Sequence, residues 1–387
     1  MNIALFTDSY TPQVNGVVTV VRALKTELEK RGHNAYVFTV WHPNATEEDG
    51  VFRVKSFRFP YEPQHRVGFF FEPQLVRQAK ELKLDIIHTH TEFSLMLAAR
   101  SIRHKLKIPS IHTLHTHYPD YLYYSPWLLR LYFRNNMDKY FNFILRSQRC
   151  VIAPSQKNKI FLGQIKFKKP VKVIPNGIDL SYFYQTNAEL AKAAHEFRAK
   201  FNLTPENKVI VFVGRLGTEK NLNVLLDNFK MIHQNMNEAR LLLVGDGPDH
   251  RELVLYAQQL GIFNTVVFTG FLRWPDEIKT AYKASDLFMS ASHSEVHPVT
   301  FIEAMAAGLP IVAPDDVSIT DMVLPGENGW TVQDDRELWV RALEILNDKA
   351  LRSAMGKKSE VISKKYSVEK FIDSMLDVYK EYAKHPL

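Results

Sequence analysis

Residues 208–214 read "KVIVFVG", an uninterrupted apolar run between Lys208 and a glycine. A short run of this kind, rich in valine and isoleucine, is typical of a strand buried on both faces of a parallel sheet. Similar runs occur in the first half of the chain at 2–8, 35–40, 85–90, 109–115 and 149–155, and in the second half at 239–247, 264–272, 285–292 and 309–314. Helical stretches are expected after them. The sequence therefore predicts an α/β protein with two doubly wound, Rossmann-like domains.

The pattern pauses at 171–183, "VKVIPNGIDLSYF", and restarts at Lys208. Proline, asparagine and glycine supply turn chemistry here, so a boundary is predicted near Pro175–Asp179. The predicted domains are 1–175 and 176–367, with a C-terminal helix at about 368–387 packing back on the first domain. Two such sheets in tandem are expected to bind ligands at the carboxyl ends of their strands.

Composition narrows the class of protein. The chain has 387 residues, 45% of them hydrophobic and 24% charged, as in a globular protein of two domains. The one cysteine, Cys150, fits a reducing cytosol. The first residues, "MNIALFTDSY", are predicted to be a strand and not a signal peptide. No apolar stretch approaches the ~20 residues that span a bilayer.

The charge is unevenly distributed. Residues 1–175 hold 26 Lys and Arg against 13 Asp and Glu, which gives +13, whereas residues 176–387 hold 23 against 29, which gives −6. A basic first half indicates an anionic partner, with nucleic acid and acidic lipid as the usual candidates. Uneven surface charge without function is the alternative.

Two stretches favour phosphate binding. A strand turns through Asn15-Gly16 directly into a helix, and free N–H groups at a helix N-terminus attract anions. A glycine needed only for a tight turn explains this feature equally well. In "FVGRLGTEKNL", Arg215 and Lys220 follow a buried strand at the start of the next helix. Two cations there can neutralise the charge that grows on a departing diphosphate.

A third stretch, "SEVHPVTFIEAMAAG", occupies 294–308. Pro298 favours a helix start, and Glu303 then lies in the early turns while Glu295 lies in the preceding loop. The N–H groups of Val299 and Thr300 are expected to be free to bind phosphate. Two glutamates at such a spacing also occur by chance, so the flanking residues carry the specificity.

Histidines cluster after two predicted strands, at His88, His90, His112, His115 and His117. Zinc binding is one interpretation. However, alternate strand residues face opposite sides and no cysteine accompanies them, so the favoured interpretation is one catalytic or substrate-binding histidine at a strand end.

Residues 123–149 interleave aromatic and leucine positions with arginine and lysine. A basic helix of this kind can lie in an anionic membrane interface. The predicted membrane-facing residues are Trp127, Leu128, Arg130, Leu131 and Arg134. An ordinary core helix with a basic outer face is the alternative, and the charge of the first half favours the membrane.

Together these motifs resemble the retaining glycosyltransferases of the GT-B fold, in the large family whose hallmark is two glutamates with seven residues between them. Glu295 and the following "EAMAAGLP" match that hallmark, and "GRLGTEKN", "VGDGP", "PNGID" and "TDSYTPQVNGV" match further family motifs. The resemblance covers essentially the whole chain. Within the family, "HTLHTHYPDY" and residues 6–33 look most like the bacterial diacylglycerol glucosyltransferases, which are monotopic enzymes that use UDP-glucose.

The resemblance implies roles for the residues that bind the donor. Gly16 would approach the donor phosphates, Arg215 and Lys220 would hold the diphosphate, and Glu303 would bind the ribose hydroxyls. The backbone at Leu272 would meet the base.

It also implies roles around the sugar. Val299 and Thr300 would donate N–H groups to the distal phosphate. Glu295 would orient the sugar, and His115 would contact sugar and acceptor from the first domain.

On the acceptor side, the resemblance implicates Asp8, Tyr10 and Arg66. Asp-x-Asp is absent from the sequence, so no metal is expected. The chain departs from the family at His297-Pro298, where most relatives have Phe-Gly or Gln-Gly. Proline has no N–H, so one donor to the sugar is lost, and the side chain of His297 is a candidate replacement.

We therefore expect a glycosyltransferase that moves a hexose from a UDP-sugar, glucose or galactose, to a membrane lipid, with 1,2-diacylglycerol favoured. The expected location is the inner face of the cell membrane, bound peripherally from the cytoplasm, with no nucleic-acid partner. The alternatives are a soluble or polyprenyl-linked acceptor, a nucleotide-sugar epimerase and a non-catalytic binding protein.

Overall fold

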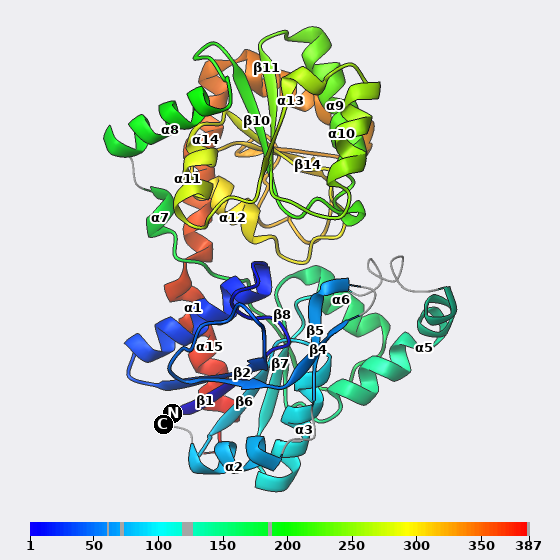
Figure 1. The fold of residues 1–387 in the computed structure, drawn as a ribbon, viewed down its shortest axis with the longest axis vertical. Coiled ribbons are helices and arrows are strands. Elements are labelled where there is room, and N and C mark those ends of the chain that lie inside the picture. The colour runs from blue at the N-terminus through cyan, green and yellow to red at the C-terminus, as the bar shows by residue number, and fades with distance from the viewer. Residues whose placement is uncertain (60–61, 70–72, 118–126, 185–187, 385–387) are drawn as a thin grey trace. The chain divides into compact units, whose positions relative to one another are not determined.

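A computed structural model describes residues 1–59, 62–69, 73–117, 127–184 and 188–384 (Figure 1). The chain divides into two compact units. Unit 1 comprises Met1–Ile178 with Val368–Leu387, and unit 2 comprises Asp179–Ser367. Each unit contains one large parallel sheet covered by helices, which confirms the predicted α/β class with two Rossmann-like sheets.

The sheet of unit 1 has seven parallel strands in the order β3-β2-β1-β6-β7-β8-β9. They are β1 (Asn2–Phe6), β2 (Asn34–Val40), β3 (Val51–Val54), β6 (Ile86–Thr89), β7 (Ser110–Thr113), β8 (Val151–Ala153) and β9 (Val171–Val173). The helices are α1 (Gly16–Lys30), α2 (Pro73–Glu81), α3 (Ser94–Leu106), α5 (Trp127–Leu145), α6 (Gln156–Gln164) and α15 (Val368–Tyr382).

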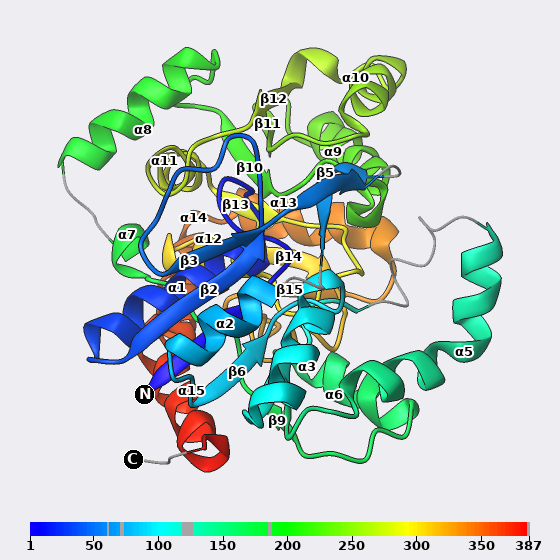
Figure 2. The ribbon, with the colours of Figure 1, turned by 60° about the horizontal axis from the view of Figure 1, so that its bottom comes forward.

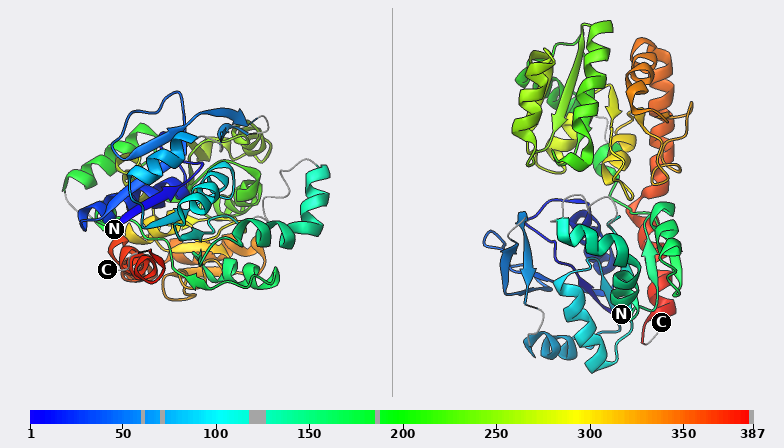
Figure 3. Two further views of the ribbon diagram at one scale, coloured as in Figure 1. Left: turned by 90° about the horizontal axis from the view of Figure 1, so that it is seen from below. Right: turned by 90° about the vertical axis from the view of Figure 1, so that its right-hand side faces the viewer.

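Helices cover both faces of this sheet. Apolar side chains of α1 and α15 pack on one face and those of α2 and α3 on the other, which explains why the strands read as continuous apolar runs. The backbone N–H of Val368 donates to the carbonyl of Ile178 at 2.9 Å. At the other end of α15, the backbone N–H of Lys384 donates to Asp85, whose carboxylate accepts from the N–H of Asn2 (Figure 3).

The sheet of unit 2 has six parallel strands in the order β12-β11-β10-β13-β14-β15. They are β10 (Lys208–Val213), β11 (Ala239–Val244), β12 (Val266–Gly270), β13 (Leu287–Met289), β14 (Ile311–Pro314) and β15 (Gly329–Val332). The α-helices are α7 (Ser181–Tyr184), α8 (Ala188–Lys200), α9 (Leu222–Asn235), α10 (His250–Gln259), α11 (Asp276–Lys283), α12 (Val299–Ala306), α13 (Leu338–Asn347) and α14 (Lys349–Ser363). Short 3₁₀ turns are η2 (Thr218–Lys220), η3 (Phe263–Thr265), η4 (Asp335–Glu337) and η5 (Lys364–Tyr366).

Three features differ from the sequence expectations. A helix was expected after residues 35–40, but β2 is followed by β3 and by an antiparallel hairpin of β4 (Ser56–Phe59) and β5 (Glu62–Gly68). Residues 171–173, taken as part of the pause between domains, form edge strand β9. The pattern also missed β15, which pairs with β14. Short edge strands have few apolar residues to bury, so their periodicity is weak.

Within the described residues, no helix is both long enough and apolar enough to span a membrane.

Candidate active site

The strand order of unit 2 places a topological switch point between β10 and β13. From β10 the chain passes through α9 to β11 on one side, whereas β13 pairs with β10 on its other side. Ligands of doubly wound sheets bind beyond the carboxyl ends of the strands at such a point. The loop after β10 carries Arg215 and Lys220, and the loop after β13 carries Glu295.

These two loops are joined by side chains. Lys220 Nζ lies 2.7 Å from Glu295 Oε1, and each side chain is 16% exposed. The hydroxyl of Ser294 donates to the carbonyl of Glu219 at 3.0 Å. Because one partner in each contact follows β10 and the other follows β13, the switch point brings together the predicted cation and the predicted carboxylate.

Arg215 lies in the same loop. Its Nη1 lies 3.9 Å from Glu219 Oε1, and the Glu219 side chain is 4% exposed whereas that of Arg215 is 32% exposed. The guanidinium thus combines a buried acidic neighbour with access to solvent. This geometry suits a cation that holds an incoming anion.

Two glycines of the "VGDGP" motif allow the loop after β11 to lie directly on the Arg215 loop. A Cβ on Gly247 would lie 2.2 Å from the carbonyl oxygen of Leu216, and one on Gly245 would lie 1.9 Å from that of Gly214. The N–H of Leu216 donates to Asp246 at 3.0 Å across the same contact. Any side chain at either glycine would force these loops apart.

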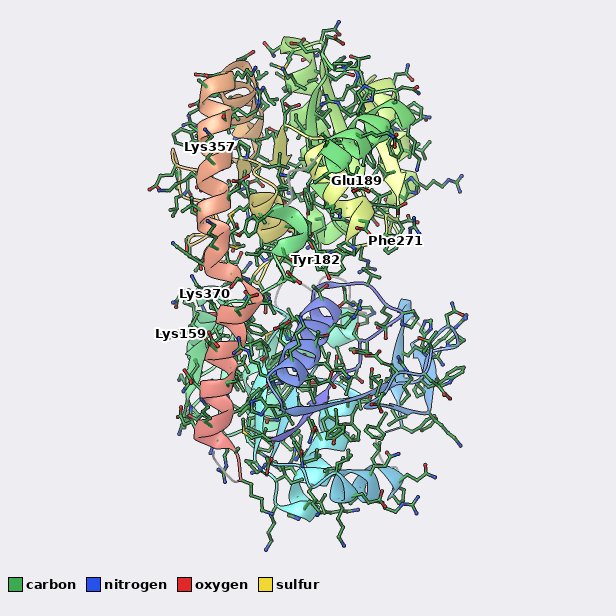
Figure 4. The ribbon with its side chains drawn as sticks, turned by 90° about the vertical axis from the view of Figure 1, so that its left-hand side faces the viewer. Lys159, Tyr182, Glu189, Phe271, Lys357 and Lys370 are labelled. Atoms are coloured by element: carbon green, nitrogen blue, oxygen red, sulfur yellow. The ribbon has the colours of Figure 1, made fainter. Side chains whose placement is uncertain are left out.

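Glu303 lies on α12 and is buried, with 4% exposure. Its carboxylate accepts hydrogen bonds from Trp274 Nε1 at 2.9 Å and from the Tyr282 hydroxyl at 3.1 Å. Burial raises the pKa of Glu303 to about 7, and the two hydrogen bonds oppose that rise. Tyr182, on the short helix α7, packs its ring edge-on against Trp274 at 5.5 Å between centroids (Figure 4).

Helix α12 begins at Val299, with Pro298 as its N-cap residue. The first N–H groups of a helix have no intrahelical acceptor, so those of Val299 and Thr300 are available to an anion. Leu272 follows β12, and its side chain is 6% exposed. These positions follow β13 and β12, at the carboxyl edge where a nucleotide is expected.

His297 lies inside unit 2. It is 4% exposed, and its ring packs against Tyr366 at 5.2 Å between centroids. Burial lowers the pKa of His297 to about 4, and the nearby Asp321 opposes that shift. That the imidazole replaces the N–H lost at Pro298 stays a prediction.

Unit 1 has its own switch point, between β1 and β6. Gly16 begins α1, and the side chain of Asn15 caps that helix by accepting from the N–H of Val18 at 3.0 Å. On the other side of the switch point, after β6 and β7, His90 Nδ1 lies 3.0 Å from His115 Nε2.

The three residues assigned to the acceptor side make internal contacts. Asp8 is buried, accepts from Thr91 Oγ1 at 2.6 Å and from Ser94, and thereby holds the start of α3. The Tyr10 hydroxyl donates to Glu48 at 3.1 Å. Arg66, on the hairpin, donates to Ser56 and stacks over the Trp41 ring at 5.2 Å.

Helix α5 projects from unit 1, and its C-terminal half packs with α3 and α6 (Figure 2). Among the predicted membrane-facing residues, Trp127 is 67% exposed and Leu131 is 48% exposed. The side chains of Leu128, Arg130 and Arg134 lie outside the described residues, as does the segment 118–126 that continues the "HTLHTHYPDY" motif.

A second exposed aromatic side chain of α5, that of Phe143, makes cation–π contacts with two arginines. Phe143 is 49% exposed, and the guanidinium groups of Arg100 on α3 and Arg146 lie 4.8 and 4.5 Å from its ring centroid. The described part of the helix thus presents aromatic rings beside arginines.

In the part of the chain that the structure describes, no group of three or more histidine, cysteine, aspartate or glutamate side chains could hold a metal ion. Two of the five clustered histidines are engaged in other contacts. His88 and His112 each use both ring nitrogens in hydrogen bonds within unit 1.

Similarity to known proteins identifies the family of this chain. Residues 14–182 match Glycosyltransferase Family 4, and residues 194–361 match Glycosyl transferases group 1. The alpha-monoglucosyldiacylglycerol synthase of Streptococcus pneumoniae is 36% identical over 349 residues, covering 89% of this chain and 78% of that protein. The chain belongs to glycosyltransferase family 4. It is a nucleotide-sugar-dependent, retaining glycosyltransferase, as the motifs predicted.

Further relatives agree with this assignment. The alpha-monoglucosyldiacylglycerol synthase of Acholeplasma laidlawii is 29% identical over 388 residues, covering 98% of this chain and 96% of that protein. Sucrose-phosphate synthase from Thermosynechococcus elongatus has the same fold, with a TM-score of 0.80, 22% identity and 98% coverage of each chain. The Anabaena protein HepE in complex with UDP-glucose gives 0.78 at 21% identity, covering 98% of this chain and 100% of that one.

Sequence reasoning missed the residues that support the family 4 site. Trp274 and Tyr282 orient Glu303, and Ser294 joins the two loops of unit 2. The dipeptide Trp274-Pro275 was a usable signal, because an indole N–H in a loop requires an acceptor once it is buried.

Proposed function

We propose that this glycosyltransferase moves glucose from UDP-glucose to 1,2-diacylglycerol in a membrane, giving a monoglucosyl diacylglycerol. The observation that carries the proposal is the Lys220–Glu295 pair at the switch point of unit 2, in a chain 36% identical to an alpha-monoglucosyldiacylglycerol synthase. Galactose is the alternative hexose, because Pro298 lacks the N–H that most relatives offer to the sugar.

The donor would bind to unit 2. Arg215 and Lys220 would hold the diphosphate, and the N–H groups of Val299 and Thr300 would bind its distal phosphate. Glu303 would accept hydrogen bonds from the ribose, with its carboxylate oriented by Trp274 and Tyr282. The backbone at Leu272 would meet the base, and Gly16 of unit 1 would donate its N–H to the phosphates.

Catalysis would depend on stabilising the leaving group. As the bond from the anomeric carbon to the phosphate oxygen breaks, positive charge develops on the sugar and negative charge on the diphosphate. The negative charge would be stabilised by Arg215, Lys220 and the N–H groups at the start of α12. Without a metal, this electrostatic stabilisation is the largest contribution to catalysis available. The acceptor hydroxyl would attack from the face that the diphosphate leaves and would pass its proton to the departing phosphate oxygen, so the anomeric configuration is retained.

Glu295 would have two effects. It would orient the sugar, and through its 2.7 Å contact it would hold Lys220 in place before the donor binds. His115, on unit 1, would contact the sugar and the acceptor. Asp8, Tyr10 and Arg66 would support the acceptor side through the internal contacts that they make.

A membrane acceptor fits the surface of unit 1. Residues 1–175 carry +13, Trp127 and Leu131 on α5 are exposed, and exposed Phe143 lies beside Arg100 and Arg146. Aromatic side chains and cations favour the interface of an anionic bilayer. We therefore place the enzyme on the inner face of the cell membrane, bound peripherally from the cytoplasm. Nucleic acid is not proposed as a partner.

The test is a transfer assay with labelled UDP-glucose and UDP-galactose, with and without diacylglycerol in vesicles of anionic lipid. One labelled glycolipid, made from UDP-glucose and only with diacylglycerol present, is expected. Turnover only with a water-soluble acceptor would overturn the lipid assignment, and consumption of the donor without any acceptor would indicate an epimerase.

A further inference from the structure

Five histidines lie at or beyond the carboxyl ends of β6 and β7 in unit 1, and two of them, His88 and His112, are committed to the fold. The ring nitrogens of His88 contact the Tyr379 hydroxyl at 2.8 Å and Thr113 Oγ1 at 2.7 Å. Those of His112 contact Thr89 Oγ1 at 2.8 Å and Glu92 Oε1 at 3.0 Å. Both rings are fully buried. Because both nitrogens of each ring already have a partner, neither ring has a nitrogen left for a substrate.

His90 and His115 form a different kind of pair. His90 is 1% exposed, its ring contacts that of His88 at 4.0 Å between centroids with the planes tilted by 39°, and its Nδ1 lies 3.0 Å from His115 Nε2. His115 is only partly buried. The described residues supply no hydrogen-bond partner for His90 Nε2. The contact with His115 is therefore the hydrogen bond that the His90 side chain makes within the described chain.

Both imidazoles are neutral at physiological pH. Burial, reinforced by the neighbouring histidines, lowers the pKa of His90 well below its ordinary value and that of His115 to about 3. Two neutral rings that meet nitrogen to nitrogen at 3.0 Å share one proton, with one nitrogen donating and the other accepting. This bond holds the plane and the tautomer of His115, as a partner on one ring nitrogen does for any histidine.

We infer that His90 is a positioning residue for His115: it engages Nε2 of His115 and leaves Nδ1 as the nitrogen that meets the sugar. The inference rests on the proposed function for the contact between His115 and the sugar. The tilted contact with His88 restricts the His90 ring, because His88 is itself fixed by Tyr379 and Thr113. Without His90, the His115 ring would be free to turn about its χ2 angle and present either nitrogen.

Two substitutions of His90 separate positioning from packing. In His90→Asn the side-chain amide can still bond to His115 near the place of Nδ1, whereas His90→Leu cannot. We expect His90→Leu to lower kcat on the order of 10²-fold, the cost of a misplaced reacting group, with little change in the KM for the donor. His90→Asn should restore kcat to within a few-fold of the unsubstituted enzyme. If His90→Leu keeps full kcat, the inference is wrong.

Substitutions of His115 test which nitrogen is used. Asparagine carries its amide near the position of Nδ1 and glutamine near that of Nε2, so His115→Asn should retain more activity than His115→Gln. The reverse order would overturn the assignment of Nδ1. Tyr256→Phe is the structural control, because it removes one side-chain hydrogen bond, to Asp227 at 2.7 Å, in unit 2 and outside this cluster. It should leave kcat unchanged.

A measurement without substrate tests the pair itself. With ¹⁵N-labelled histidine, NMR of the free protein should show nitrogen–nitrogen coupling between one Nδ1 and one Nε2, and this coupling should vanish in His90→Leu. Absence of the coupling from the unsubstituted protein overturns the inference. If the coupling is present but His115→Leu transfers glucose at the full rate, the role of His115 in the proposed function fails and the pair stands as structure alone.

Discussion

Lys220 Nζ lies 2.7 Å from Glu295 Oε1, although the two residues are 75 positions apart in the chain. The contact closes the switch point between β10 and β13, and it sets a cation and a carboxylate side by side before any donor is present. The substitutions Lys220→Ala and Glu295→Gln each remove one partner of this contact.

Lys220→Ala should lower kcat on the order of 10²-fold, the loss typical of removing one charge-stabilising group. The reason is that the diphosphate would lose a cation as its charge grows. The measurement is steady-state transfer from UDP-glucose. Lys358→Ala is a matched control, because Lys358 Nζ also lies 2.7 Å from a carboxylate, that of Glu327, on an exposed part of unit 2. Near-normal turnover in Lys220→Ala would contradict the proposed diphosphate site.

Glu295→Gln should separate catalysis from binding of the nucleotide. The substitution keeps the shape of the side chain but removes the negative charge beside Lys220. We expect kcat to fall by at least about tenfold because the sugar is no longer oriented by a carboxylate. UDP should bind equally well or more tightly because Lys220 has lost its counter-charge, as titration calorimetry can measure. Weaker binding of UDP would show that Glu295 holds the nucleotide site together instead.

Binding of the donor should depend on the ionisation of Glu303. Its pKa is raised to about 7 by burial, and a carboxylate accepts hydrogen bonds from ribose hydroxyls better than a carboxylic acid does. The KM for the donor should therefore rise as the pH falls below about 7, and this dependence should be lost in Glu303→Gln. Trp274→Phe removes a hydrogen bond that lowers the pKa, so it should move the transition to higher pH.

The raised pKa of Glu303 also makes the stability of the folded protein depend on pH. The folded pKa of Glu303 lies above its ordinary value of 4.5, so its contribution to folding is fully present below that value and is lost as the pH rises through about 7. The thermal midpoint of the unsubstituted protein should fall relative to that of Glu303→Gln between pH 5 and pH 8. If the difference between the two thermal midpoints does not change over this pH range, Glu303 does not have a raised pKa.

Arg146→Gln should weaken binding to vesicles that contain anionic lipid. A cation near such a surface contributes about 1 kcal/mol, so the partition coefficient should fall by about fivefold. Cosedimentation with vesicles measures it. Arg336→Gln is the control, since that side chain is 88% exposed in unit 2 and lies outside the proposed lipid surface. Equal loss in both variants would mean that binding follows net charge and not α5.

Gly247→Ala should destabilise unit 2 by about 1–3 kcal/mol, the usual cost of overpacking. The new Cβ would lie 2.2 Å from the carbonyl oxygen of Leu216 and would push the Arg215 loop outward, so UDP binding should weaken too. Gly163→Ala on α6 is the control. Among the described residues, no atom beyond its chain neighbours and its own helix backbone lies within 4 Å of its Cβ position, and alanine should stabilise that helix slightly. Urea unfolding of the two variants should therefore shift in opposite directions.

Much of the fold follows from local patterns. The apolar runs at 2–8 and 208–214 predict strands because a strand covered on both faces must be apolar throughout. Asn15 and Gly308 predict helix ends, and the structure has α1 beginning after Asn15 and a positive φ of 81° at Gly308. The hairpin after β2 was not predicted, since prolines at 60 and 63 interrupt its sequence and argue against a strand there.

The candidate site, like the fold, was predictable from the sequence only in part. Sequence alone determined which residue types are present: two cations after one strand, two glutamates around a helix start, and histidines after two strands. Only the tertiary structure decided which of them meet. The switch point between β10 and β13 brings Lys220 to Glu295, burial draws His297 into the interior beside Tyr366, and the adjacent strands β6 and β7 bring His90 to His115. Strand order and burial depend on contacts between distant segments, so no local pattern contains them.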